Sequence, residues 1–454
     1  MNIVLITHEM DPFVGRGTVA QVAGALPKAL RSLDHEVSVI LPLFEGIDPA
    51  KHSLARRLSK LTFEVGGKEY ACEQWNGRTI SGVEAIFIGH EELFHSVPAL
   101  DAGSDDEVAL RAGVFARAVA ALLEKNEPGW EVVHAHGWLG AASLAAASEA
   151  GVGLPAVLTV HDPRADGPSM EDGIVPGVGS EGVLAAGARR AEVIAVGSPN
   201  VAKTLAESLG DNIGNREIRA IANGVDEATW NPLTDPELPA RFDPVDLRGK
   251  ARCKAELQRR LEVPVRADAP VVTVLGREPE AWRRFVKTAP RILRNDVQVI
   301  ALGAPDVDGL RDGLADLQDR WPDRFQARSL DGKEGGKLDH LARAGADLAL
   351  VLTDHAPDAI DPMIVQRYGA VPIVPRVGAI ADTVVDCDAN LETGTGFLFE
   401  AKDEEELLGG VRRAIGAFGR EGFGDLQSRV MRIDSSWERS ARLHGMLYEG
   451  LVES

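Results

Sequence analysis

The sequence contains only three cysteines among its 454 residues, Cys72, Cys253 and Cys387, and they lie far apart. Isolated cysteines without a CxxC pair argue against a disulfide framework and against a cysteine zinc site. No stretch reaches about 18 uninterrupted apolar residues, and the apolar run at 2–7 is too short for a signal peptide and has no basic flank. These absences predict a cytoplasmic protein that has three free thiols and no membrane partner.

Positive charge is also scarce. Lys and Arg together number 49 against 69 Asp and Glu, which gives a formal net charge of −20. A surface of this sign repels nucleic acid and anionic lipid, so we expect no nucleic-acid partner. An anionic small ligand would need a local basic pocket.

The length fits two domains of roughly 200 residues each, and the balance of 44% hydrophobic and 26% charged residues is that of a globular protein. Short runs rich in Val, Ile and Leu alternate with Ala/Leu/Arg-rich segments of helical spacing. The first set of predicted strands covers 2–7, 36–42, 131–134, 156–161, 192–197 and 218–222, with helices between them at 19–33, 108–124 and 181–190. Strands alternating with helices predict parallel βαβ units that are covered on both faces.

A second set of predicted strands covers 270–276, 297–303, 346–352, 371–374 and 396–399. Between the two sets, the stretch 231–246 is rich in Pro and Asp, which excludes regular helix and central strand and indicates a linker. The predicted domains are therefore 1–245 and 246–426. The remaining segment, 427–454, is predicted to hold one amphipathic helix at 427–451 that returns to the first domain.

The predicted fold class is α/β, with two doubly wound Rossmann-like domains. Such sheets bind ligands at the carboxyl ends of their strands. We therefore expect a site in a cleft that the two domains share.

Motifs along the whole chain support a family resemblance. The segment 1–42 contains Glu9, Pro12, Gly17 and the run VAGALPKAL at 22–30; HAHGW follows at 134–138, and LTVHD at 158–162 has Gly167 five residues further on. NGVD at 223–226, WNP at 230–232, RYG at 367–369, GTGF at 394–397 and SWERS at 436–440 complete the series. In this order and spacing, the sequence resembles bacterial glycogen synthases and starch synthases.

The resemblance implies the GT-B fold, two facing Rossmann-like domains. It also implies a retaining glucosyltransferase that uses no metal or other cofactor and adds glucose from ADP-glucose to an α-1,4-glucan. A nucleotide sugar and an α-glucan are thus the expected ligands. The family's lysine in the first motif is replaced by Gly15, with Arg16 and Gly17 beside it as candidates for phosphate binding.

The second phosphate motif of the family, R-L-x-x-Q-K-G, corresponds to Arg277 through Arg283. Arg277 matches the family arginine, but Trp282 stands at the lysine and Arg283 at the glycine. Arginine can contact phosphate through a forked set of donors, so Arg277 and Arg283 are candidates, while a solvated helix face is the other interpretation of Arg283 and its neighbour Arg284.

The family's E-P-x-G-L motif supplies a glutamate beside the donor sugar, and here that position is Ala356. Asp358 is the candidate substitute, and a helix-capping aspartate is the alternative. His161 matches the family histidine beside the donor glucose and is the second catalytic candidate. Gly378 and Thr383 resemble the family's phosphate turn, whose backbone amides could meet a phosphate, although an ordinary strand-to-helix turn is equally compatible.

His134 and His136 alternate at a strand end, but no third ligand has suitable spacing, and we predict no metal site. The PGVG segment at 176–179 lies where family members carry a longer glucan-contacting insertion. Two main hypotheses remain open: a working synthase in which neighbouring groups replace the lost ones, and an inactive homologue that binds glucan or nucleotide as a partner or regulator of an active glycogen synthase. A transferase with a changed donor or acceptor is a third.

Overall fold

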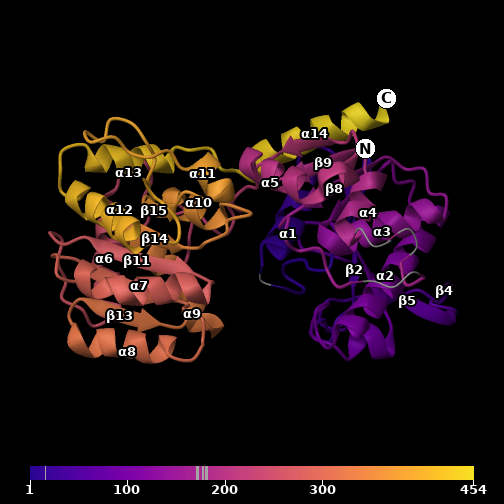
Figure 1. Ribbon diagram of the computed structural model, residues 1–454, viewed down its shortest axis with the longest axis horizontal. Helices are drawn as coiled ribbons and strands as arrows, with labels where there is room; N and C mark the ends of the chain where they lie inside the picture. Colours follow the sequence, from indigo (N-terminus) through magenta and orange to yellow (C-terminus); the bar gives the residue numbers. More distant parts are fainter. Residues whose placement is uncertain (16, 170–172, 176–177, 179–181, 454) are drawn as a thin grey trace. The chain divides into compact units, whose positions relative to one another are not determined.

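The computed structural model describes the chain except for residues 16, 170–172, 176–177, 179–181 and 454. The chain divides into two compact units. Unit 1 consists of Met1–Gly224 together with Trp437–Ser454, and unit 2 consists of Val225–Ser436. The α/β class predicted from the alternating runs is confirmed in both units (Figure 1).

Unit 1 is built on a sheet whose strands follow the spatial order β10-β9-β8-β7-β1-β2-β6-β5-β3, with β4 paired to β5. The strands are β1 (Asn2–Ile6), β2 (Glu36–Pro42), β3 (Ala55–Arg56), β4 (Leu61–Val65), β5 (Lys68–Arg78), β6 (Glu84–Gly89), β7 (Val132–His136), β8 (Ala156–Val160), β9 (Val193–Val196) and β10 (Glu217–Ala220). The central strands β10 to β6 are parallel, whereas β3, β4 and β6 pair antiparallel with β5.

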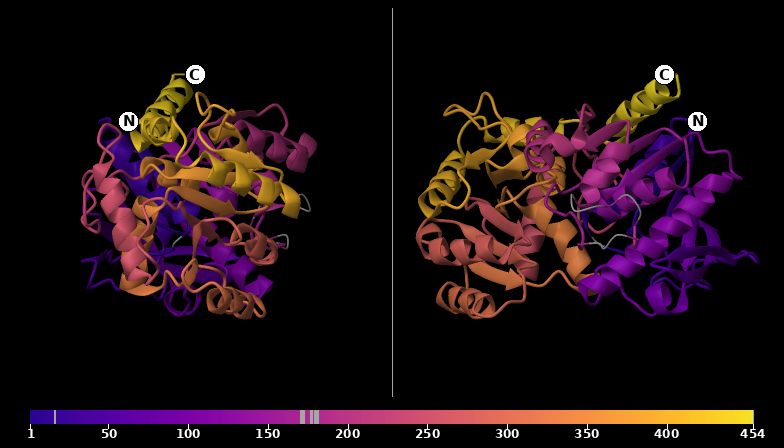
Figure 2. Two further views of the ribbon diagram at one scale, coloured as in Figure 1. Left: turned by 90° about the vertical axis from the view of Figure 1, so that its left-hand side faces the viewer. Right: turned by 45° about the vertical axis from the view of Figure 1, so that its right-hand side comes forward.

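The helices of unit 1 are α1 (Thr18–Arg31), α2 (Asp105–Lys125), α3 (Gly137–Glu149), α4 (Val183–Arg190), α5 (Pro199–Leu209) and α14 (Trp437–Val452), with a π-turn η1 (Glu91–His95) and a 3₁₀ turn η2 (Gly210–Ile213). α2 begins with a capping box between Ser104 and Glu107 that satisfies backbone N–H groups at the helix start. α14 packs against α1, so both ends of the chain lie near each other in unit 1 (Figures 1 and 2).

Unit 2 has the parallel strand order β13-β12-β11-β14-β15-β16. The strands are β11 (Val271–Gly276), β12 (Gln298–Leu302), β13 (Phe325–Arg328), β14 (Leu348–Leu352), β15 (Val371–Pro375) and β16 (Phe397–Phe399). The helices are α6 (Arg248–Arg260), α7 (Pro279–Ile292), α8 (Leu310–Arg320), α9 (Gly332–Gly345), α10 (Ile360–Arg367), α11 (Gly378–Thr383), α12 (Glu404–Ala417) and α13 (Phe423–Met431). This order is that of the doubly wound dinucleotide-binding fold, in which the chain reverses direction between the first and fourth strands.

The segment 231–246 contains no helix or strand, as its proline content predicts. This segment and the residue before it pack on unit 2: the ring of Trp230 stacks on that of His340 with centroids 4.3 Å apart, and Asp235 accepts hydrogen bonds from His340 (2.7 Å) and Tyr368 (2.5 Å). The division between the units consequently falls between Gly224 and Val225 instead of after residue 245.

The single helix expected at 427–451 is two helices, α13 and α14, and that prediction is wrong. Asp434 interrupts the pattern, because its carboxylate accepts hydrogen bonds from the backbone N–H and the hydroxyl of Ser436. A short polar side chain that bonds the backbone two residues on favours a turn over continued helix. The chain returns to unit 1 at this turn, and α14 alone packs there.

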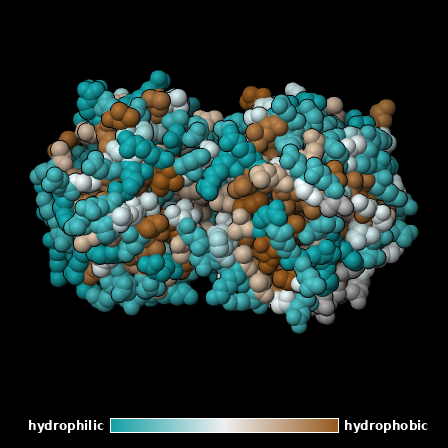
Figure 3. All heavy atoms as spheres, turned by 90° about the horizontal axis from the view of Figure 1, so that it is seen from above, coloured by the Kyte–Doolittle hydropathy of each residue, from teal (hydrophilic) through white to brown (hydrophobic). Residues whose placement is uncertain are grey.

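None of the helices within the described part of the chain is long and apolar enough to cross a membrane. Hydrophilic side chains make up most of the face shown in Figure 3, in keeping with the charged composition. Cys72, Cys253 and Cys387 are each buried and free in the structure.

Candidate functional site

The two points where strand order reverses are the places to look for ligand-binding residues. In unit 1 the reversal lies between β1 and β7, with β8 next in the sheet. In unit 2 it lies between β11 and β14. His161 follows β8, Arg277 follows β11 and Asp358 lies in the loop after β14. Gly378 and Thr383 follow β15, the next strand of the sheet of unit 2.

Three histidines gather where β7 and β8 end in unit 1. His134 and His136 alternate along β7, with ring centroids 4.2 Å apart, and both are fully buried. Nδ1 of His136 lies 3.0 Å from Nε2 of His161, which directly follows β8. The catalytic candidate His161 is thus hydrogen-bonded to a residue of β7, the strand that lies beside β8 in the sheet.

Burial keeps this histidine cluster neutral. Desolvation lowers the pKa of His134 and of His136 well below 6.5, and it lowers the pKa of His161 to about 3. A neutral imidazole presents one donor and one acceptor, so His161 is suited to hydrogen bonding with a sugar hydroxyl. Within the described residues, no group of three or more His, Cys, Asp or Glu side chains could hold a metal ion.

The glycines of the two histidine motifs behave differently. Gly137 has a φ of +64°, and a Cβ placed there would meet no atom of the described residues within 4 Å. Gly167 has a φ of +76°, and a Cβ there would lie 2.6 Å from the ring of Trp138. Trp138 therefore packs directly on Gly167, which leaves no room for a side chain at position 167. No described atom fills the space beside Gly137.

The loop between β1 and α1 carries the first phosphate motif. Gly15 has a φ of +89°, and a Cβ there would lie 2.5 Å from the carboxyl group of Glu9. A lysine at position 15 would thus be strained and would displace Glu9. Gly17 is the N-cap of α1, and Arg16 lies outside the described residues.

In unit 2, Glu278 occupies the point where the strand order reverses. Its carboxylate accepts hydrogen bonds from the backbone N–H groups of Asp354 (2.9 Å) and His355 (3.3 Å), and from the hydroxyl of Thr353. These donors follow β14, whereas Glu278 follows β11. An internal carboxylate therefore holds the backbone donors that this end of the sheet would otherwise offer to an anion.

Trp282 stands at the family's lysine position and is fully buried. Its indole N–H donates to the carbonyl oxygen of Gly276 at 2.9 Å, and its ring packs edge-on against Phe285 in the core of the unit. A cationic side chain at position 282 could reach a phosphate only if the core around Trp282 were repacked.

The three arginines of the same segment differ in exposure and in their ion pairs. Arg277 is exposed, and no described residue bonds to its guanidinium. Arg283 is half-exposed and pairs with Glu280 on its own helix, as the solvated-face interpretation expects. Arg284 is largely buried and pairs with Asp354. Arg277 is thus the one predicted phosphate candidate of this motif whose guanidinium no described residue holds.

The remaining donor-side candidates are engaged within the protein. Ala356 is buried, and its carbonyl accepts the N–H of Ala379 at 2.8 Å. A Cβ at Gly378 would lie 2.0 Å from the same carbonyl. The hydroxyl of Thr383 donates to the Ala379 carbonyl at 2.8 Å. The turn at Gly378, which resembles the family's phosphate turn, is consequently packed against Ala356, where the family has a glutamate.

Asp358 accepts the backbone N–H of Ile360, the first residue of α10, at 3.0 Å. The contact is a local turn in which the carboxylate bonds a backbone N–H two residues on; the N-cap of α10 is Ala359, whose side chain makes no cap hydrogen bond.

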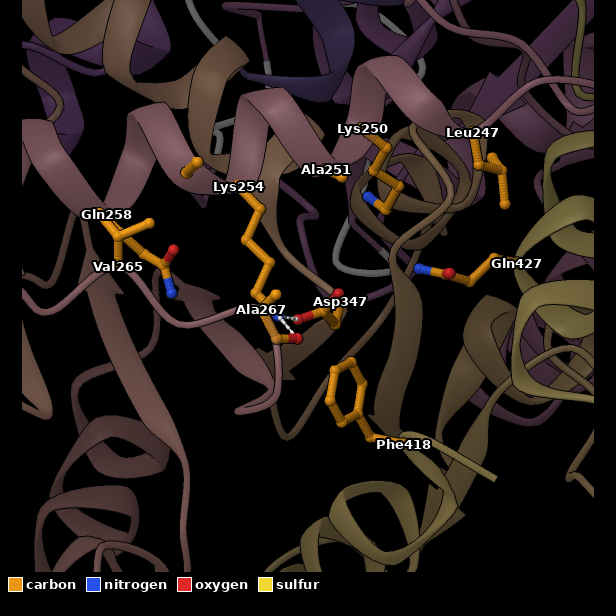
Figure 4. Close-up of a pocket in the computed structure, with 11 residues that line it drawn as sticks. Leu247, Lys250, Ala251, Lys254, Gln258, Val265, Ala267, Asp347, Phe418 and Gln427 are labelled. Atoms are coloured by element: carbon orange, nitrogen blue, oxygen red, sulfur yellow. Dashed lines mark hydrogen bonds and ion pairs between the residues drawn. The ribbon is translucent and has the colours of Figure 1, made fainter. Parts of the chain in front are cut away.

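A pocket of about 230 Å³ opens elsewhere in unit 2, beside α6 (Figure 4). Lys254 in this pocket pairs with Asp347 at 2.8 Å, and Lys250 donates to the carbonyls of Ala344 (3.0 Å) and Tyr368 (2.9 Å), which close α9 and α10. Asp347 precedes β14, so the pocket lies at the amino ends of the strands. Its two lysines hold helix ends and strand starts together.

Sequence reasoning missed Glu278 and Tyr448. Tyr448 of α14 is fully buried, and its hydroxyl donates to Nδ1 of His134 at 2.7 Å. Glu278 corresponds to a leucine of the family motif. An acidic residue at an apolar motif position could have marked it as a residue with a role in the site. No local pattern marks Tyr448, because its partner lies in a strand 314 residues away.

Comparison with known proteins agrees with this architecture. The family model described as starch synthase catalytic domain matches residues 2–209. The chain is 33% identical to a glycogen synthase of Anaeromyxobacter sp. (strain Fw109-5), with 100% of both chains covered. It is 30% identical to glycogen synthase 1 of Geobacter sulfurreducens, covering 99% of this chain and 96% of the relative.

Solved structures show the same fold. The catalytic domain of starch synthase IV from Arabidopsis thaliana, bound to ADP and acarbose, superposes with a TM-score of 0.85 at 23% identity, covering 100% of this chain and 99% of that one. Sucrose-phosphate synthase from Thermosynechococcus elongatus superposes with a TM-score of 0.66 at 17% identity, with the same coverage. The GT-B fold implied by the sequence motifs is confirmed.

Proposed function

The chain belongs to the glycogen and starch synthase family, and from this we propose that it binds an α-glucan through unit 1 while transferring glucose from ADP-glucose negligibly. The observation that carries the proposal is the position of Trp282. In the family a lysine there meets the donor pyrophosphate, and here the residue is a core tryptophan with 0% exposure.

The chemistry of the reaction explains why this loss matters. Breaking the bond between glucose and the nucleotide leaves negative charge on the departing diphosphate, and cations or N–H donors must stabilise it. Unit 2 offers Arg277 for this purpose, but Arg284 is paired with Asp354, and the amides after β14 are held by Glu278. Removal of one such donor costs about 10²- to 10³-fold in rate.

The donor sugar also loses its partner. Ala356 can neither accept a hydrogen bond from a hydroxyl nor stabilise positive charge, and Asp358 bonds the backbone N–H of Ile360 in a local turn. Unit 1 loses its lysine as well, since Glu9 occupies the space beside Gly15. Several losses at one reaction centre are not additive in detail, but together they place transfer at least about 10³-fold below an intact member of the family.

Unit 1 supports glucan binding instead. His161, whose family counterpart lies beside the donor glucose, keeps its place after β8 with its Nε2 bonded to His136, and Gly137 leaves a space at the end of β7 that no described atom fills. The structure of starch synthase IV, to which the whole chain is similar, holds acarbose as well as ADP. By this likeness we assign an α-1,4-glucan as the ligand class of unit 1, and a role as partner or regulator of an active synthase follows for a member that binds without transferring.

The test is transfer of radiolabelled glucose from ADP-glucose, and in parallel from UDP-glucose, to glycogen by the purified protein. An intact glycogen synthase serves as the positive control. We expect no incorporation above background, together with heat of binding when maltoheptaose is titrated in. Turnover within about 10³-fold of the control would refute the inactive assignment. Absence of maltoheptaose binding would refute the glucan assignment.

A slow transferase is the second candidate, favoured by the exposed guanidinium of Arg277. The same assay decides between the two, because Arg277→Ala would abolish any residual incorporation that depends on this side chain. In an inactive member, the substitution changes nothing.

A further inference from the structure

We propose that Tyr448 of the C-terminal helix is a positioning residue, which acts through His134 and His136 to hold the ring of His161 with its proton on Nδ1. The assignment of a sugar-binding role to His161 rests on the proposed function. The position of its proton does not, because it follows from the hydrogen bonds within unit 1.

The first link joins α14 to β7. The hydroxyl of Tyr448 lies 2.7 Å from Nδ1 of His134, and both side chains are fully buried. Burial raises the pKa of Tyr448 well above 10, so the hydroxyl keeps its proton. We take Tyr448 as the donor, because His134 is its hydrogen-bond partner among the described residues, and a hydroxyl that only accepted here would leave its own buried proton without an acceptor. Nδ1 of His134 is then the acceptor, and the ring carries its proton on Nε2.

The second link fixes His134 from its other side. Nε2 of His134 lies 2.6 Å from the hydroxyl oxygen of Thr159, which is on β8 two residues before His161. With the proton on Nε2, His134 donates to Thr159. The ring is therefore held at both nitrogens, between the C-terminal helix and the strand that ends at His161.

The third link passes from His134 to His136 by ring contact. The two ring centroids are 4.2 Å apart with planes inclined by 37°, and His136 in turn stacks on His161 at 5.3 Å with planes inclined by 19°. Rings packed this closely cannot rotate independently. A fixed His134 consequently restricts His136.

The hydrogen bond between His136 and His161 then fixes the proton of His161. Nε2 of His136 is buried and has no hydrogen-bond partner in the described structure. An unpaired buried N–H is rarer than an unpaired buried acceptor, so the proton of His136 belongs on Nδ1. His136 therefore donates to Nε2 of His161 at 3.0 Å, and His161 keeps its proton on Nδ1.

This arrangement defines what His161 presents to a ligand. Its Nε2 is used, no described residue bonds to its Nδ1, and the side chain is partly exposed. The Nδ1–H group is a neutral donor, which matches an oxygen acceptor such as a sugar hydroxyl and offers nothing to an ammonium or another donor. The C-terminal helix thus holds in place the ring packing that supports this hydrogen bond, at a residue that is distant from it in sequence.

The experiment is long-range ¹H–¹⁵N NMR of the full-length protein with ¹⁵N-labelled histidine, with signals assigned by single histidine substitutions. We expect the wild-type protein to show His161 protonated on Nδ1 and His134 on Nε2. In Tyr448→Phe, which removes only the hydroxyl, His134 should show a mixture of both tautomers, and the His161 signals should shift and broaden because the rings of His134 and His136 that pack toward it are no longer held in one position. Thr159→Val breaks the same chain on the other side of His134 and should have the same effect.

Tyr368→Phe is the matched control, because it removes another buried tyrosine hydroxyl, the one that donates to Asp235 in unit 2. It should leave the His161 signals unchanged. The proposal is overturned if wild-type His161 is protonated on Nε2, or if neither Tyr448→Phe nor Thr159→Val alters its signals in folded protein.

Maltoheptaose titration separates this proposal from the proposed function. We expect Kd to rise three- to tenfold in Tyr448→Phe and to stay the same in Tyr368→Phe. Wild-type protein that fails to bind maltoheptaose refutes the proposed function, while the NMR result still decides the role of Tyr448.

Discussion

The two units differ at the carboxyl ends of their sheets, where this chain lacks residues that the family motifs contain. In unit 1 the histidine motifs remain, and Gly137 leaves the space of a missing side chain open. In unit 2 the corresponding positions are filled from within, by Trp282 in the core and by Glu278 on the amides after β14. An open position can still receive a ligand, whereas a filled one has become part of the folded structure.

The largest expected difference between the two units is the loss of stability of unit 1 in acid. Burial lowers the pKa of His8 to about 4, of His161 to about 3 and of His444 to about 4, and it also lowers the pKa of His134 and His136. The unfolded chain, with histidine pKa values near 6.5, binds protons that folded unit 1 does not. The stability of unit 1 is thus fully present above about pH 6.5 and falls toward pH 4, by up to about 1.4 kcal/mol per pH unit for each histidine.

Hydrogen exchange followed by mass spectrometry between pH 7 and 4 resolves the two units by their peptides. Unit 1 should lose protection first, because the only histidines of unit 2, His340 and His355, are partly exposed. His444→Gln should make the decline shallower by about 1.4 kcal/mol per pH unit, and His52→Gln is its control. If unit 2 loses protection first, the buried histidines of unit 1 do not determine which unit is less stable in acid.

Restoring the family lysine at position 282 is the next largest change. Trp282→Lys removes a large aromatic ring from the core and buries an amine without a partner, so unit 2 should lose about 4 kcal/mol of stability. Urea unfolding followed by circular dichroism measures the loss. Arg283→Lys, one residue along on the exposed face, should change stability by less than about 0.5 kcal/mol. A stable Trp282→Lys protein with new transferase activity would show that the position had merely been vacated.

Glu278→Leu should have a smaller effect. The substitution leaves the N–H group of Asp354 without its acceptor and removes one of the two acceptors of the His355 N–H and of the Thr353 hydroxyl, which costs about 1–3 kcal/mol. Amide exchange in the loop after β14 should accelerate in the variant. Glu280→Leu, which removes an exposed carboxylate from the same helix, is the matched control and should leave that loop unchanged. Equal effects from both substitutions would mean that Glu278 has no special hold on the loop.

Much of the fold could be predicted from residue patterns, since every strand expected in the sequence is present. The hairpin of β4 and β5 was missed, although Gly66 and Gly67 between two runs of strand-like residues signal it. The boundary at 245 and the continuous last helix failed for tertiary reasons: Trp230 and Asp235 pack on unit 2, and Asp434 turns the chain.

The site shows where local reasoning stops. Helical spacing from Ala281 to Ile292 is enough to put Trp282 and Phe285 on one buried face and Arg283 on the other side. Motif matching alone counted Trp282 as a lost charge and not as a core residue. The bonds of Glu278 to the β14 loop and of Tyr448 to His134 join residues that only the sheet order brings together, and no sequence period encodes them.

The return of α14 to unit 1 also sets an order of events during synthesis. Unit 2 is a continuous segment inserted into the chain of unit 1, so it can fold on the ribosome as soon as Ser436 has emerged. Unit 1 begins first but waits for α14, which brings Trp437 to its core and Tyr448 to His134. The earlier half of the protein is therefore completed last, and residues 225–436 are the segment to express alone, whereas removing α14 leaves unit 1 unfinished.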